Sequence, residues 1–384
     1  MEQEVLDLHK KHTGVLSIKD EINVTNSHDL ALAYTPGVAG LSKLIEKEPD
    51  LARDYTISGK VVAVVTDGTA VLGLGNVGPQ AGLPIVEGKA LLYKSLADVD
   101  AFPICIKQGS VDEAVATIQN LELSFAGIHL EDIQAPACFE IEDRLQEMLS
   151  IPVYHDDQEG TAIVVLAGLL NAAKLAGKHL SEMKVLINGV GASGIATANL
   201  LHAAGITKMT LVDIEGVLSN GKGCSNPYQE ALVERINYEV DANTLEEALV
   251  GQDAFIGLSD ANLVTSAMVT TMAENPIIFA LANPVPEITP DEAKKGGAHL
   301  IGTGSSAYPN QINNILAFPG LFKGLLKAKI NAVTLPLQVV VAEAIAGLVS
   351  EPTAEKLVPG VFDAGVVEAV TDAIVNFKEK EEAL

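Results

Sequence analysis

Two pairs of acidic residues come directly after predicted strands in the first half of this 384-residue sequence. Glu131 and Asp132 follow one apolar run, and Asp156 and Asp157 follow another. Because ligands of open α/β sheets bind outside the carboxyl ends of the strands, the two pairs should meet in one crevice. Clustered carboxylates repel one another and usually need a cation, and ligands that are all oxygen favour Mg²⁺ or Mn²⁺ over Zn²⁺. A single such pair is more often a helix cap or a solvated turn, so the metal-site hypothesis depends on both pairs.

Two other side chains could move protons beside such a cation. Lys89 lies in EGKALLYK, near the start of a predicted helix rich in apolar residues, where loss of water would lower its pKa and make it a general base. Tyr34 precedes a Pro-Gly turn in YTPGVA that would hold the phenol in place. By pattern alone, a surface lysine and a core tyrosine are the commoner outcomes. His129 and His155 lie near the acids and are more often core or supporting residues than ligands.

The glycine-rich segment GVGASG at residues 189–194 has the full context of a dinucleotide-binding turn. It follows the predicted strand Lys184–Asn188 and opens the predicted helix Ile195–Ala204. Its three glycines would allow a tight turn, a close approach of pyrophosphate, and packing of the helix on the strand. The helix N-terminus would offer unpaired N–H groups to the phosphates. The residues predicted to bind the cofactor are Gly189, Gly191, Ala192, Ser193, Gly194, Ile195 and Asp213.

The choice between the two nicotinamide cofactors depends on Asp213, which ends the next predicted strand. Its carboxylate can accept hydrogen bonds from ribose hydroxyls and would repel a 2′-phosphate, so the sequence favours NAD. Lys222 on the following loop could reach a phosphate, which leaves NADP possible. The alternative interpretation is a glycine-rich turn without a ligand.

Alternation of strands and helices predicts an α/β fold with parallel sheets. A boundary is expected in the helix near residues 160–177. It would separate an N-terminal α/β catalytic domain, 1–160, from a Rossmann-like doubly wound dinucleotide-binding domain with C-terminal helices, 161–384. The predicted strands are residues 61–66, 102–106, 126–130, 152–154, 184–188, 209–212, 254–258, 277–281 and 299–301. The predicted helices include residues 87–96, 111–121, 138–149, 160–176 and 195–204.

Composition narrows the possible partners. The formal net charge of −25 disfavours nucleic acid. The three cysteines are widely spaced and form neither a disulfide framework nor a zinc motif, as expected in a reducing cytoplasm. The N-terminal residues have no apolar signal-peptide core, and the apolar runs look too short to cross a bilayer. We therefore expect a soluble cytoplasmic protein without a membrane partner.

Several of these motifs recur in one known family, which the chain closely resembles. From about Gly14 to Gly320 the sequence is similar to the malic enzymes in their short bacterial form. The motifs that carry the resemblance occur in order: YTPGVA at 34, VVTDG and LGLGNVG within 64–78, EGKALLYK at 87, GIHLEDIQAP at 127, DDQEGTA at 156, GVGASG at 189, LANPVPE at 281 and NQINNILAFPG at 310.

The resemblance implies oxidation of L-malate with NAD(P) and decarboxylation to pyruvate and CO₂, with Mg²⁺ or Mn²⁺, and also decarboxylation of oxaloacetate. Lys89 would be the general base, Asp156 would tune it, and Tyr34 would protonate the enol. Family members are dimeric or larger, so a homodimer is expected. The metal ligands would be Glu131, Asp132 and Asp157, and the residues touching substrate or nicotinamide ribose would be Asn283 and Asn313.

One position departs from the family pattern. Longer members carry an arginine that grips the substrate where this chain has Ala70. Lys94, the backbone amides of residues 73–78 or a lysine of a partner subunit could bind the second substrate carboxylate instead.

Two alternatives remain beside the oxidative reaction. A malolactic enzyme of the same family would use nearly the same residues and release lactate. A non-catalytic nicotinamide-binding sensor would need only the glycine-rich turn, and the complete set of acids, lysine and tyrosine argues against it.

Overall fold

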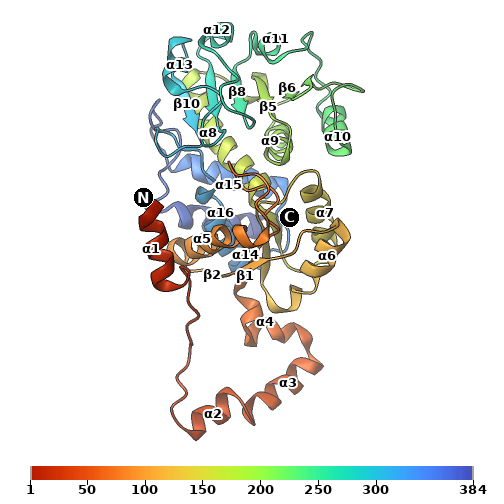
Figure 1. The fold of residues 1–384 in the computed structure, drawn as a ribbon, viewed down its shortest axis with the longest axis vertical. Helices are drawn as coiled ribbons and strands as arrows, with labels where there is room; N and C mark the ends of the chain where they lie inside the picture. Colours follow the sequence, from red (N-terminus) through yellow and green to blue (C-terminus); the bar gives the residue numbers. More distant parts are fainter. Residues whose placement is uncertain (1, 383–384) are drawn as a thin grey trace.

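The computed structural model describes residues 2–382 and contains two sheets that follow one another along the chain (Figure 1). The first has the strand order β2-β1-β3-β4, and all its neighbouring strands are parallel. Its strands are β1 (Val61–Thr66), β2 (Asp100–Cys105), β3 (Gly127–Leu130) and β4 (Val153–His155). The helices that alternate with them are α5 (Pro79–Ala97), α6 (Val111–Gln119) and α7 (Ala137–Met148).

The register of this sheet aligns the ends of three strands. All six residues of β1 are buried, as expected for a β-branched run in the centre of a parallel sheet. Val65 is paired with Leu130, and Leu130 with His155. The residues that follow β3 and β4 therefore emerge side by side, which is the arrangement predicted for the two acidic pairs.

The second sheet has the order β10-β9-β8-β5-β6-β7, in which only β7 runs antiparallel among the described strands. Its strands are β5 (Lys184–Asn188), β6 (Lys208–Asp213), β7 (Gly216–Val217), β8 (Ala254–Gly257), β9 (Ile277–Ala280) and β10 (Leu300–Thr303). Its helices are α9 (Ala192–Ala203), α10 (Pro227–Ile236), α11 (Leu245–Leu249), α12 (Ser266–Val269) and α13 (Pro290–Lys295). The predicted α/β class with a doubly wound second sheet is confirmed.

A long buried helix links the two sheets. It begins as a π-helical turn, Asp156–Gly160, and continues as α8 (Thr161–Ala176). The joined helix of 21 residues is long and apolar enough to cross a membrane, longer than the sequence suggested. However, 72% of its apolar stretch is buried inside the fold, as in the core helix of a globular protein.

Three C-terminal helices complete the core: α14 (Phe318–Ala328), α15 (Leu335–Gly347) and α16 (Val366–Glu382). Helix α15 packs on α8 and α9, whereas α14 returns to α5 of the first sheet. There Phe318 and Phe322 lie edge-on to Tyr93, with ring centroids 4.9 and 5.7 Å away. The part of the chain that follows residue 161 thus packs against both sheets. The division into two domains at residue 160 stays a prediction.

The N-terminal residues form helices with little packing. They are α1 (Glu2–His12), α2 (Ser27–Ala33), α3 (Gly37–Lys47) and α4 (Ala52–Tyr55), and the last three extend away from the body of the molecule (Figure 1). We call residues 18–57 the N-terminal arm. The structure describes all of them, and none is buried.

Candidate functional site

Three carboxylates converge where β3 and β4 end. Oxygen atoms of Glu131, Asp132 and Asp157 lie within 4.8 Å of one another, and the Asp132 backbone N–H donates to Asp157 Oδ2 at 2.9 Å. Burial, reinforced by the charge of Glu131, raises the pKa of Asp132 to about 7. Burial and the charges of Glu131 and Asp132 raise the pKa of Asp157 well above its usual value. This all-oxygen donor set fits a divalent cation, which would let the three carboxylates ionise together.

Lys89 lies against the same acids. Its side chain is 13% exposed, and its ammonium forms ion pairs with Asp156 and, at 3.2 Å, with Glu131. Tyr154 donates its hydroxyl to the other Asp156 oxygen at 2.5 Å. The structure therefore confirms that these residues meet, and it adds Tyr154, whose buried position in β4 the sequence motifs do not single out.

The predicted lowering of the Lys89 pKa is wrong for this arrangement of charges. Burial acts to lower the pKa of Lys89, but the charges of Asp156 and Glu131 outweigh it, so the pKa lies above its usual value. The sequence prediction considered only the apolar neighbours on the helix. The helix pattern says nothing of carboxylates that follow other strands, although the family resemblance implied that Asp156 lies beside Lys89.

Of the two histidine rings, that of His129 is hydrogen-bonded to one of the acids, whereas the buried ring nitrogens of His155 have no hydrogen-bond partner among the described residues. His129 is fully buried, shares a hydrogen bond of 2.8 Å with the Tyr93 hydroxyl and contacts Glu131 at 2.7 Å. Burial lowers the pKa of His155 to about 3, so its ring is neutral. His129, Glu131 and Asp156 also lie close enough for a metal, but the Lys89 ammonium already contacts two of these three.

The glycine-rich turn has the shape that the dinucleotide fingerprint requires. Gly189 has φ +97°, and a Cβ there would lie 2.4 Å from the Leu258 carbonyl oxygen. A Cβ on Gly194 would lie 2.0 Å from the Gly189 carbonyl oxygen, so only glycine lets α9 approach the strand. No atom lies within 4 Å of a Cβ built on Gly191, which leaves its backbone open to a phosphate. The residues present therefore fit a dinucleotide.

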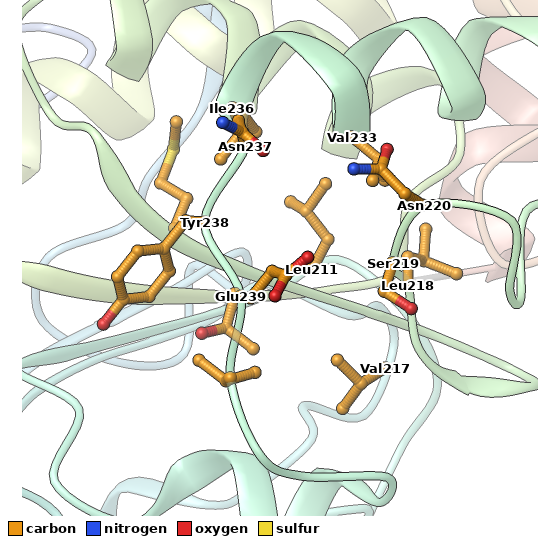
Figure 2. Close-up of a pocket in the computed structure, with 13 residues that line it drawn as sticks. Leu211, Val217, Leu218, Ser219, Asn220, Val233, Ile236, Asn237, Tyr238 and Glu239 are labelled. Atoms are coloured by element: carbon orange, nitrogen blue, oxygen red, sulfur yellow. The ribbon is translucent and has the colours of Figure 1, made fainter.

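One cleft joins the acids to this turn. It has a volume of about 780 Å³, ample for a nicotinamide and a small acid. The predicted site residues that line it are Asp157, Ala192, Ser193, Asn283 and Asn313, and Ala70 lies there too. The small cavity in Figure 2, between β6, β7 and α10, measures only about 20 Å³ and has room for little more than a water molecule.

Two predicted residues do not join the others within one chain. Tyr34 lies on the N-terminal arm and is 67% exposed. Lys94 contacts Asp98 at 2.7 Å and Asp100 at 2.9 Å, and it does not line the cleft. Of the backbone amides of residues 73–78 suggested for the second substrate carboxylate, those of Gly73 and Gly75 belong to residues that line the cleft, and that role stays a prediction.

Another buried carboxylate at the cleft was missed by sequence reasoning. Glu287 accepts hydrogen bonds from the backbone N–H groups of Ser259 at 3.0 Å and Ala282 at 3.1 Å. It thereby fastens the two loops that follow β8 and β9, both of which line the cleft. Its place in LANPVPE, directly after a buried strand, was the available signal.

Comparison with known proteins gives one family over most of the chain. The malic enzyme N-terminal domain matches residues 15–146, and the malic enzyme NAD binding domain matches residues 158–375. A bifunctional malic/malolactic enzyme of Bacillus subtilis (strain 168) is 48% identical over 98% of this chain and 92% of its own length. An NAD-dependent malic enzyme of Geobacillus stearothermophilus is 44% identical, over 94% of this chain and 76% of its own.

A solved structure agrees with the sequence relatives. The crystal structure of malic enzyme from Pyrococcus horikoshii Ot3 has a TM-score of 0.96 and 41% identity, covering 99% of this chain and 91% of that one. The two matched domains together span more than half of the sequence. The chain belongs to the malic enzyme family.

Proposed function

We propose that this protein oxidises L-malate with NAD and decarboxylates the product to pyruvate and CO₂, and that it also decarboxylates oxaloacetate. The observation that carries the proposal is the cleft itself. Asp157 of the three-carboxylate cluster, next to the Lys89–Asp156 pair, faces the same 780 Å³ space as Ser193 of the open glycine-rich turn. A hydride acceptor and a cation-bound hydroxy acid would therefore be neighbours.

The chain's own residues then have distinct tasks. Glu131, Asp132 and Asp157 would hold Mg²⁺ or Mn²⁺, which would orient malate, polarise its C2 oxygen and offset the carboxylate charge that keeps Lys89 protonated. Lys89 Nζ would accept the hydroxyl proton while NAD takes the hydride from C2. Asp156, held by Tyr154, would keep Nζ in position. Asn283 and Asn313, which also line the cleft, would contact substrate or nicotinamide ribose.

Tyr34 would act from a second copy of the chain. The arm exposes large apolar side chains, including Ile18 at 89% and Leu32 at 66%, a pattern that marks an uncovered interface. A homodimer that covers the arm would bury these side chains and could carry Tyr34 to the partner's cleft. In this arrangement Tyr34 would protonate the enol carbon, and the partner could also supply the missing contact to the second carboxylate.

The reaction can be tested by following reduced nicotinamide and pyruvate with purified protein, L-malate, Mn²⁺ and NAD. Equimolar NADH and pyruvate, abolished by EDTA and in Lys89→Ala, are the expected result. With NADP in place of NAD, kcat/KM for malate oxidation should be lower. Failure of the purified protein to consume malate under any of these conditions would refute the proposal.

The net charge of −25 of the chain disfavours a nucleic-acid partner, and we expect a cytoplasmic location without a membrane partner.

A malolactic reaction is the second candidate, because the relative at 48% identity is named a bifunctional malic/malolactic enzyme. It would consume malate, release lactate and leave no net NADH. Measuring lactate beside pyruvate in the same assay separates the two reactions.

A further inference from the structure

The buried amide of Gln229 joins the glycine-rich turn to Asp213. Gln229 is only 2% exposed. Nε2 donates to the Val190 carbonyl oxygen at 2.8 Å and to Asp213 Oδ2 at 2.7 Å. Oε1 accepts from the Ser225 backbone N–H at 2.7 Å and from the Ser225 hydroxyl at 3.1 Å. An amide has two N–H donors and one oxygen with two lone pairs, so every hydrogen-bonding position of Gln229 is used.

These contacts fix the distance between two parts of the dinucleotide site. Val190 follows β5 in the turn that would receive the pyrophosphate, and Asp213 ends β6 where the ribose would lie. Gln229 itself is fixed in the first turn of α10, because its backbone N–H donates to the capping Asn226 Oδ1 at 3.1 Å. The second oxygen of Asp213 accepts from the Ile214 backbone N–H at 3.0 Å. The carboxylate is therefore held at both oxygens.

We propose that Gln229 is a positioning residue that sets the preference for NAD over NADP, an inference that rests on the proposed use of NAD. A 2′-phosphate can enter only if Asp213 turns away, and turning would leave a buried N–H of Gln229 without an acceptor. The one cation in residues 214–226, Lys222, donates instead to Asn243 Oδ1 at 2.6 Å. Discrimination thus comes from the amide that holds the carboxylate as well as from the carboxylate itself.

The test compares Gln229→Met, which keeps the volume but removes all four contacts, with Gln252→Met as a matched control. Gln252 is another buried glutamine beside the second sheet, in the turn before β8; it is 3% exposed and donates to Thr210 Oγ1 and the Ala248 carbonyl oxygen. Fluorescence titration with NADH and NADPH gives the dissociation constants, and malate oxidation with each cofactor gives kcat and KM. For Gln229→Met we expect NADH to bind about tenfold more weakly, the NAD/NADP ratio of kcat/KM to fall about tenfold, and kcat with saturating NAD to stay within about twofold.

Ser225→Ala gives a milder second variant that removes one contact to Oε1 and cannot leave a large cavity. Its NADH dissociation constant should rise about two- to threefold with kcat unchanged. The inference would be overturned if the NAD/NADP ratio of kcat/KM is unchanged in Gln229→Met, or if NADH affinity falls equally in Gln229→Met and Gln252→Met. If Gln229→Met does not fold, an unchanged NADH dissociation constant in Ser225→Ala would overturn it instead. Wild-type protein that binds NADH but does not oxidise malate would refute the proposed reaction while the titrations still decide the role of Gln229. Wild-type protein that binds neither nucleotide would overturn both.

Discussion

The acid cluster and the N-terminal arm differ in almost every physical property. Around Glu131 and Asp157 most of the charged groups are buried, and Glu131 and Asp156 are each held by hydrogen bonds or ion pairs from more than one element. Along residues 18–57 the situation is reversed, because apolar side chains are exposed and none of these described residues is buried. One region carries uncompensated charge inside the fold, and the other carries uncovered apolar surface outside it.

Both regions indicate something that a single chain does not supply. Buried carboxylates with raised pKa values are costly unless a cation joins them, and exposed apolar helices are costly unless another surface covers them. The cluster therefore indicates a small charged ligand, whereas the arm indicates a macromolecular one. Tyr34 connects the two regions, because it takes part in the chemistry proposed at the cluster but lies on the N-terminal arm.

The largest effect should follow removal of one ligand from the cluster. Asp157→Asn takes away a negative oxygen from the trio, so kcat should fall by about 10³-fold and Mn²⁺ should bind much more weakly. Manganese binding can be measured directly by electron paramagnetic resonance without substrate. Asp143→Asn is a matched control, because Asp143 is a carboxylate of α7 that bonds Tyr228 and lies outside the trio. Undiminished Mn²⁺ affinity in Asp157→Asn would contradict the metal assignment.

Mixing two inactive variants tests whether Tyr34 on the arm acts in its own chain or in the cleft of a partner subunit. Tyr34→Phe should lower kcat by about 10²-fold, as loss of a general acid does. If Tyr34 serves the partner's cleft, a refolded equal mixture of Tyr34→Phe and Lys89→Ala should regain about a quarter of wild-type activity, because half the dimers are mixed and one of their two sites is complete. Activity no greater than the average of the two variants would show that Tyr34 acts, if at all, within its own chain.

The difference between these regions also explains what sequence could predict. The central strands were predicted within about two residues, since buried parallel strands are continuous apolar runs. The meeting of Glu131 with Asp156 followed from the rule that parallel strands end at one edge. The rise in the Lys89 pKa did not follow from the local helix pattern, because Asp156 is 67 residues away in sequence; the family resemblance implied that the two meet but not the direction of the shift. The position of Tyr34 was missed because nothing local shows that the arm leaves the body.

An interface on the arm makes a further prediction of moderate size. Leu32→Asp would place a charge where another copy should pack, so the dimer dissociation constant should rise at least about tenfold. Analytical ultracentrifugation at several protein concentrations measures this constant. Leu123→Asp is the matched control, because Leu123 is 87% exposed on the body rather than on the arm. Equal dissociation constants for the two variants would place the interface elsewhere.

The smallest expected effect is on the pH dependence of stability, and it concerns Glu142, a buried carboxyl outside the acid cluster. Glu142 is nearly inaccessible, accepts from Gln158 Nε2 at 2.6 Å and lies beside Glu159, whose carboxyl accepts from Gln338 Nε2 at 3.1 Å. Burial raises the pKa of Glu142 from 4.5 to about 8. The folded state therefore holds a proton that the unfolded state releases above about pH 4.5, and this stabilisation is lost as the pH rises through about 8.

Glu142→Gln imitates the protonated carboxyl at every pH and should flatten that dependence. The free energy of unfolding of wild-type protein should fall by about 1 kcal/mol more than that of the variant between about pH 7 and about pH 8. Urea unfolding at a series of pH values measures both curves. Because the arm has no buried residue, its interface should show no matching change, and dimer dissociation should vary less with pH than unfolding does. Parallel unfolding curves for wild type and variant would mean that Glu142 is already ionised in the fold, and that the buried charge extends beyond the cluster around Asp157.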